Sequence, residues 1–153
     1  MNTLELKIPP PLVAVVLALA MWLTSLLCES TRMPLSIRLG SSLALVAVGQ
    51  GISIAGILSF RRARTTVNPL RPHAASSLVT TGIYRYTRNP MYVGLLLTLL
   101  GWGAFLGSPH ALLWLVVFVL YMNRFQIAAE ERVLSSLFGD AYVAYSARAR
   151  RWL

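Results

Sequence analysis

The sequence predicts an all-α integral membrane protein with about four transmembrane helices, and two observations support this fold class. Of its 153 residues, 56% are hydrophobic and only 12% are charged, whereas a soluble domain carries about 25% charged residues. The hydrophobic residues also occur in long blocks, where a half-buried soluble element would alternate apolar and polar positions. The length suits one domain, so residues 1–153 are interpreted as a single membrane domain.

Four apolar blocks account for the predicted spans. They run over residues 11–27, 39–60, 92–107 and 111–128. A spanning helix needs about 20 mostly apolar residues, so the second block fits well and the others need flanking residues to complete them. The first block has features of a signal peptide, but prolines 9–11 and the long second block favour an uncleaved span. Ser108 and Pro109 predict a tight helical hairpin between the third and fourth spans.

Arginine placement predicts the orientation of these spans. The net charge is +9, and Lys7 is the only lysine. Six arginines and no acid lie in residues 61–88, and four more lie in residues 132–151. Because cytoplasmic loops collect positive charge, we expect an inner-membrane protein with both termini in the cytoplasm. The arginines flank apolar blocks, so we expect no nucleic-acid partner. Cys28 is the only cysteine, and no Cys/His cluster predicts a metal site.

The first polar segment, residues 82–94, crowds tyrosines and arginines against the start of the third span. A structural explanation stays open, because Asn89 and Pro90 are favoured at a helix start and Tyr and Arg are common at membrane interfaces. A helix N-terminus beside Arg85 and Arg88 also favours a carboxylate or phosphate ligand. The tyrosines suit stacking on an aromatic ring or contact with a cation.

The second polar segment, residues 123–153, contains paired acids. If the fourth helix continues past the membrane, Arg124 and Glu131 lie seven residues apart on one face. Glu130 and Glu131 are either a solvated pair beside Arg132, which contributes little stability, or a carboxylate site for hydroxyls or a cationic cofactor. The run FGDAYVAY predicts a helix that ends at Gly139 and a short amphipathic helix after it.

In this order, the two segments resemble the isoprenylcysteine carboxyl methyltransferase and phospholipid methyltransferase superfamily, whose members are small membrane enzymes that use S-adenosylmethionine. The resemblance covers residues 65–153. The family pattern Gly-x-Tyr-x-x-x-Arg-His-Pro-x-Tyr-x-Gly appears as Gly82, Tyr84, Arg88, Asn89, Pro90, Tyr92 and Gly94. The family's paired acids before Leu-x-x-x-Phe-Gly appear as Glu130 and Glu131, before Leu134, Phe138 and Gly139.

The resemblance implies a division of labour along the chain. Residues 61–153 would form a cofactor-binding half under a helical C-terminal lid, and residues 1–60 a scaffold on the substrate side. Catalytic roles would fall to Glu131 and to Arg124, which resembles the family arginine near the substrate. The S-adenosylmethionine-binding residues would be Leu78, Val79, Gly82, Tyr84, Arg88, Asn89, Pro90, Tyr92, Gly94, Glu130 and Glu131.

One departure from the family pattern limits the chemistry. Asn89 replaces the usual histidine, and an amide cannot titrate, so this position cannot supply a general base. Methyl transfer from a sulfonium depends mainly on alignment and exclusion of water. The predicted acceptor is apolar or amphipathic: a lipid, an isoprenoid-like carboxylate, an amine or a thiol. An ionised acceptor needs no strong base, whereas a neutral hydroxyl or an ammonium group does.

Two other functions were weighed. Membrane sterol and steroid reductases, which use NAD(P)H, resemble the same half but usually carry an acid after Asn-Tyr-x-Gly. Here Leu95 follows Gly94, which favours the methyltransferase. A membrane scaffold leaves the clustered Tyr, Arg and Glu residues unexplained. Prolines 69 and 72 predict that the long loop before the first polar segment is not a regular helix.

Overall fold

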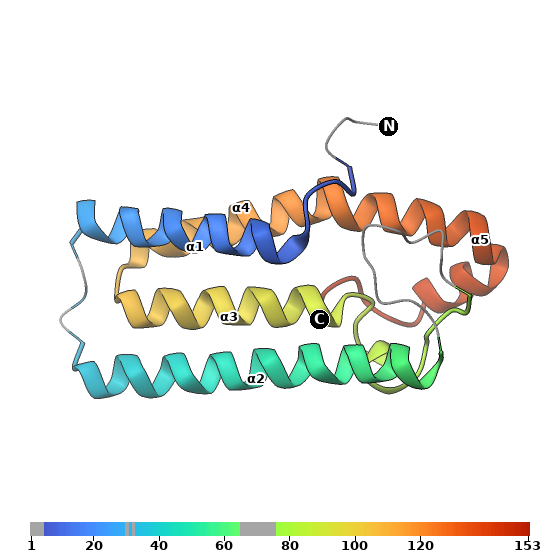
Figure 1. Cartoon of the computed structure of the whole chain (residues 1–153), viewed down its shortest axis with the longest axis horizontal. Coiled ribbons are helices and arrows are strands. Elements are labelled where there is room, and N and C mark those ends of the chain that lie inside the picture. Colours follow the sequence, from blue (N-terminus) through green and yellow to red (C-terminus); the bar gives the residue numbers. More distant parts are fainter. Residues whose placement is uncertain (1–4, 30, 32, 65–75) are drawn as a thin grey trace.

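The computed structural model describes residues 5–29, 31, 33–64 and 76–153, and its regular structure is helical. The helices along the long axis are α1 (Pro10–Leu27), α2 (Leu35–Arg62), α3 (Pro90–Leu106) and α4 (Leu113–Tyr121) (Figure 1). A π-helical turn (Met122–Ile127) joins α4 to α5 (Ala128–Ser146), and 3-10 turns occupy Gly82–Arg85 and Pro109–Leu112. Within the described ranges there is one isolated bridge, from Thr87 to Arg150, and no strand. The all-α prediction is confirmed.

Three helices are long and apolar enough to cross a membrane: α1, α2 and the continuous Pro109–Ser146 helix. The chain is therefore an integral membrane protein, as predicted. The helix α3 is apolar but shorter, with 17 residues. It begins at Pro90, which needs no backbone N–H partner at a first helical position, and ends before Gly107 in the left-handed conformation (φ 66°). The predicted hairpin at Ser108 and Pro109 then leads into α4.

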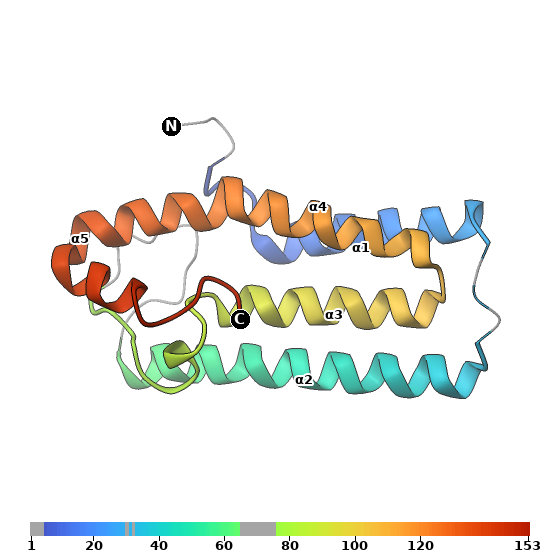
Figure 2. The same cartoon turned by 180° about the vertical axis from the view of Figure 1, so that it is seen from behind.

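The helix α3 lies at the centre of the bundle, with α2 on one side and α1 and α4 on the other (Figures 1 and 2). The apolar core includes Met21, Phe118, Met122 and Ile127, all fully enclosed. The outer faces of α1, α2 and α4 expose many leucines and valines, as expected of helices that face lipid. Because these outer faces contact lipid in place of water, the helices do not need the polar face of soluble amphipathic helices.

One end of this bundle carries most of the polar structure. The fourth helix continues beyond its apolar block, because α4, the π turn and α5 form one continuous helix. The predicted break is confirmed: Gly139 adopts a positive φ of 49° inside α5. Beyond this kink the chain reverses, and the C-terminal tail returns to the start of α3 (Figure 2). The proline-bearing loop falls largely within residues 65–75, outside the described residues.

The contact between α2 and α3 depends on glycines. A Cβ atom at Gly94 would lie 2.0 Å from Ser53 Oγ and 2.5 Å from the Gly49 carbonyl oxygen. We therefore expect Gly94→Ala to lower the free energy of unfolding by about 1–3 kcal/mol, the usual effect of overpacking. Gly51→Ala is the matched control, because a Cβ there meets nothing within 4 Å and alanine is the better helix former. Thermal unfolding in one detergent measures both; equal melting temperatures would contradict the prediction.

Candidate cofactor site

The two polar segments meet at the end of α3. Arg88, just before α3, donates to Glu131 of α5 over 2.9 Å, and this ion pair is mostly shielded from solvent. One turn into α3, the Tyr92 hydroxyl donates a hydrogen bond to Glu130. These contacts join residues 43 and 38 positions apart in the sequence. The fold therefore brings together the halves of the sequence pattern.

A buried polar cluster forms behind this contact. Glu130 accepts hydrogen bonds from Tyr92 and, over 3.0 Å, from Gln126 Nε2. Tyr92 is 4% exposed and Gln126 is 2% exposed, so the carboxyl depends on these donors in place of water. Gln126 lies in the π-helical turn, a feature frequent at functional sites. Sequence reasoning missed Gln126, although a glutamine at the end of a long apolar run was an available signal.

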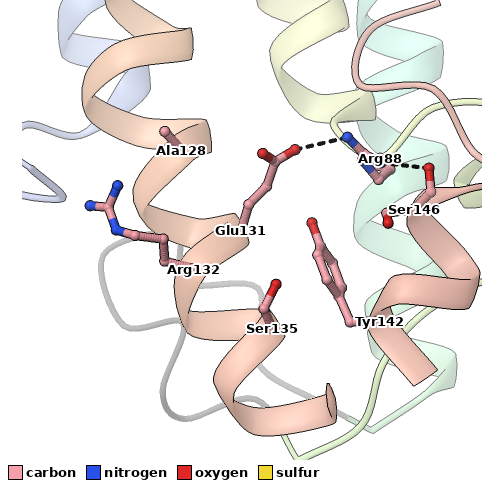
Figure 3. Close-up of a pocket in the computed structure, with 7 residues that line it drawn as sticks. All are labelled: Arg88, Ala128, Glu131, Arg132, Ser135, Tyr142 and Ser146. Atoms are coloured by element: carbon pink, nitrogen blue, oxygen red, sulfur yellow. Dashed lines mark hydrogen bonds and ion pairs between the residues drawn. The ribbon is translucent and has the colours of Figure 1, made fainter. Parts of the chain in front are cut away.

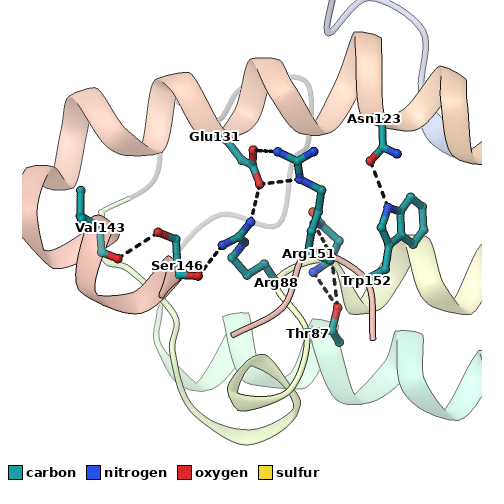
Figure 4. Close-up of polar contacts among 9 residues, drawn as sticks. Thr87, Arg88, Asn123, Glu131, Val143, Ser146, Arg151 and Trp152 are labelled. Carbon is teal, nitrogen blue, oxygen red and sulfur yellow. Dashed lines mark hydrogen bonds and ion pairs between the residues drawn. The ribbon is translucent and has the colours of Figure 1, made fainter. Parts of the chain in front are cut away.

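Glu131 has two arginine partners in the structure. Besides Arg88, it pairs with Arg151 of the tail, whose Nη2 lies 2.5 Å from Glu131 Oε2 and whose Nε lies 3.1 Å from Oε1 (Figure 4). Arg88 also donates through Nη1 to the Ser146 carbonyl over 2.8 Å. Its Nε is buried and has no hydrogen-bond partner among the described residues. A buried N–H without an acceptor is costly, and Arg88 lines the pocket described below.

The C-terminal tail, residues 147–153, closes over the start of α3. Asn89 donates through Nδ2 to the Arg151 carbonyl over 2.8 Å, and Trp152 Nε1 donates to Asn123 Oδ1 over 3.0 Å (Figure 4). The Arg88 amide donates to the Arg150 carbonyl over 2.8 Å. Asn89 is the residue before α3, as its sequence context predicts, but its side chain makes no capping hydrogen bond. It binds the tail instead.

Other residues of the predicted site have different neighbours. Tyr84 packs edge-on against Phe60 of α2, with ring centroids 5.2 Å apart, and its carbonyl accepts from the Tyr145 hydroxyl. Burial is the main reason that the pKa of Tyr84 is raised, followed by the nearby Tyr145 and Glu130. Its hydroxyl therefore stays protonated. Gly82 begins the 3-10 turn with a positive φ of 63°. This left-handed backbone conformation favours glycine. Val79, which precedes this turn in the sequence, is buried.

Pro90, Leu78 and Gly94 of the predicted site make no hydrogen bond or ion pair to Arg88 or Glu131 among the described contacts. Pro90 is the buried first residue of α3, and Leu78 is half-buried. Gly94 lies against α2, as described above. For Pro90 and Gly94 the structure shows a packing role. Whether they also approach a cofactor stays a prediction.

Arg124 is not brought to Glu131. Its Nη1 lies 3.7 Å from Glu5 Oε1, and Glu5 Oε2 accepts from Arg132 Nη2 over 2.6 Å. The Glu5 side chain is only 4% exposed, whereas the side chains of Arg124 and Arg132 are 57% and 55% exposed, so Glu5 is the buried partner of two largely exposed arginines. A regular α-helix would align residues seven apart, but the π turn at Met122–Ile127 changes this register. No local sequence pattern indicated Glu5 as a partner.

A pocket opens beside the Arg88–Glu131 pair. Its volume is about 500 Å³, and Figure 3 shows seven lining residues: Arg88, Ala128, Glu131, Arg132, Ser135, Tyr142 and Ser146. This volume lies in the range of small-molecule sites. Arginine can bind a carboxylate, Glu131 can accept from hydroxyl or ammonium groups, and Tyr142 offers an aromatic surface. The donor set suits a zwitterionic ligand with an aromatic part.

Comparison with known proteins gives the family. Residues 37–141, more than half of the chain, match the family described as phospholipid methyltransferase. The chain belongs to this family. A protein-S-isoprenylcysteine O-methyltransferase of Schizosaccharomyces pombe is 32% identical over 107 residues, covering 69% of this chain and 44% of the relative. The superfamily predicted from the two motifs is therefore confirmed, and so is the prediction of a methyltransferase at the level of the family.

Two further relatives show how far this similarity extends. The protein-S-isoprenylcysteine O-methyltransferase B of Arabidopsis thaliana is 29% identical over 106 residues, covering 69% of this chain and 54% of the relative. An uncharacterised protein of Haemophilus influenzae is 51% identical over 63 residues, which is 41% of this chain and 100% of the relative. The chain spans about half the length of the isoprenylcysteine methyltransferases that it matches. No solved structure matches it.

Proposed function

We propose that this chain is a membrane methyltransferase that binds S-adenosylmethionine in the pocket beside Arg88 and Glu131. The observation that carries the proposal is the meeting of the two family motifs through the Arg88–Glu131 ion pair and the Tyr92–Glu130 hydrogen bond. Family membership supports methyl transfer as the chemistry. The buried, unpartnered Arg88 Nε supports the fit, because the cofactor carries carboxylate and hydroxyl oxygens.

The residues of the pocket would have separate tasks. S-adenosylmethionine would supply an electrophilic methyl group on a sulfonium. Arg88 would bind the carboxylate end, and Glu131 would accept from hydroxyl or amino groups. Tyr92 and Gln126 hold Glu130 in place behind the pocket. The chain's contribution is alignment and exclusion of water, and the tail is positioned to exclude water because it covers the start of α3.

The acceptor would be apolar or amphipathic, because the pocket lies at one end of lipid-facing helices. Asn89 cannot remove a proton, so an acceptor that arrives ionised, such as a carboxylate or thiolate, suits the site best. Residues 1–60 would form the substrate side and residues 61–153 the cofactor side. The polar end would lie in the cytoplasm at the inner membrane, because it carries the arginines that end α2 and those of the tail.

Calorimetric titration of the detergent-purified protein tests this proposal. We expect S-adenosylhomocysteine, the product form of the cofactor, to bind with one-to-one stoichiometry, and NADPH at the same concentration to give no heat of binding. Binding of NADPH alone would transfer the protein to the reductase class. Heat from neither ligand, with a cooperative unfolding transition as proof of folding, would refute the cofactor assignment.

A further inference from the structure

A second pocket lies on the other face of the C-terminal part of α5. Its volume is about 430 Å³, and its lining includes Thr80, Arg85, Tyr145 and Arg148. It shares no lining residue with the pocket of Figure 3. The segment after Gly139 therefore separates two pockets, with Tyr142 and Ser146 on one side and Tyr145 on the other.

The charges of this second pocket are all positive. Arg85 and Arg148 line it together, and no acidic residue does so. Neither guanidinium makes an ion pair or hydrogen bond with any other residue in the described part of the chain. The arginines that do pair are Arg88, Arg124, Arg132 and Arg151, with Glu5 or Glu131. Two unpaired guanidinium groups in one pocket favour an anion, and their planar donor geometry suits phosphate.

The rest of the lining leaves room for such a group. Ala141, Ala144 and Ala149 contribute small walls, and Thr80 adds a hydroxyl. The pocket lies at the polar end of the bundle, where α2 ends in Arg61 and Arg62. In the proposed orientation this end faces the anionic lipids of the cytoplasmic leaflet, which attract basic residues.

We infer that this pocket binds the phosphate of an anionic phospholipid head group. The lipid would bridge Arg85 in the 3-10 turn before α3 and Arg148 in the tail, two segments of different parts of the chain. It would thereby hold the reversed segment of α5, whose other face borders the candidate cofactor pocket. This binding site does not depend on methyl transfer, and the lipid here is distinct from the methyl acceptor.

Titration with a short-chain, water-soluble phosphatidylglycerol tests the site. The wild-type protein, purified in an uncharged detergent, should bind this lipid more tightly than inorganic phosphate at the same ionic strength. Arg85→Gln and Arg148→Gln should each weaken lipid binding about tenfold, as expected for the loss of one charge-assisted hydrogen bond. Arg62→Gln is the matched control, because it removes the same charge at the same end without lining the pocket.

A variant that keeps the charge gives independent evidence. Ala144→Leu places a larger side chain in the pocket and should also weaken lipid binding, since Ala144 lines it. Equal losses from Arg62→Gln and Arg148→Gln would show diffuse attraction and overturn the inference. Inorganic phosphate that binds as tightly as the lipid would overturn the assignment to a lipid. Thermal unfolding confirms that each variant is folded, so the result stands whether or not S-adenosylhomocysteine binds.

Discussion

Replacing Glu131 with glutamine is expected to weaken S-adenosylhomocysteine binding by about 10- to 100-fold, the loss for one hydrogen bond to a charged partner. Glu131 is the carboxylate of the candidate pocket and the partner of both Arg88 and Arg151. Glutamine keeps the size of the side chain but loses the charge, so both arginines lose their ion pair. Isothermal titration of the purified variant measures the change in affinity.

The matched control is Asp140→Asn, which makes the same change of charge and shape at an exposed residue nine positions further along α5. Asp140 has no ion pair within the described residues, and its substitution should leave affinity unchanged. The Arg88–Glu131 pair is mostly shielded, whereas Arg151 is 43% exposed, so the Glu131→Gln substitution should lower the free energy of unfolding by about 1–3 kcal/mol. A variant that loses folded protein and binding in parallel would support a purely structural role for Glu131.

The membrane fold could be predicted from the sequence because its signals are local. Long apolar blocks give spans, Pro90 and Gly107 give the ends of α3, and Gly139 gives the reversal in α5. Each depends on the backbone preferences of one residue or the composition of one block. The family resemblance implied that both segments bind the cofactor. The pairing of Arg88 with Glu131 was not predicted, since nothing local in either segment specifies the other.

The contacts that complete the site could not be predicted because they join distant segments. Asn123 and Trp152 lie 29 residues apart, and Glu5 and Arg132 lie 127 residues apart. Gln126 reaches Glu130 within one stretch of helix, yet its role depends on the π turn, which has no simple sequence signal. The contact of Arg124 with Glu5 has the same source, because an alignment of Arg124 with Glu131 at seven residues assumes an uninterrupted α-helix. Whether Arg124 approaches a substrate stays a prediction.

Asn89 stands where the family pattern has a histidine, and its hydrogen bonds show what the amide contacts instead. The side-chain Nδ2 of Asn89 donates to the Arg151 carbonyl, and the backbone N–H of Asn89 donates to Thr87 Oγ1 over 3.1 Å. The Asn89 side chain therefore holds the tail against the start of α3. In the family pattern this position carries a histidine, which could transfer a proton. In this contact the side chain acts as a donor, and an amide can donate at every pH.

Replacing Tyr92 with phenylalanine tests the polar cluster around Glu130 and is expected to lower the free energy of unfolding by about 1–3 kcal/mol, because the partly buried Glu130 carboxyl loses a donor. The ring is retained, so its packing in the core is unchanged. Because Glu130 precedes Glu131 in the same turn, we also expect a roughly tenfold loss of S-adenosylhomocysteine affinity.

Tyr86→Phe is the matched control for this change, because Tyr86 is 70% exposed and loses a hydroxyl that water already hydrates. It should leave both stability and affinity unchanged. Gln126→Leu removes the other donor to Glu130, so a double-mutant cycle with Tyr92→Phe should show non-additive losses, as expected for residues that share one partner. Additive losses would indicate that Tyr92 and Gln126 act separately, and that Glu130 is not the centre of the cluster.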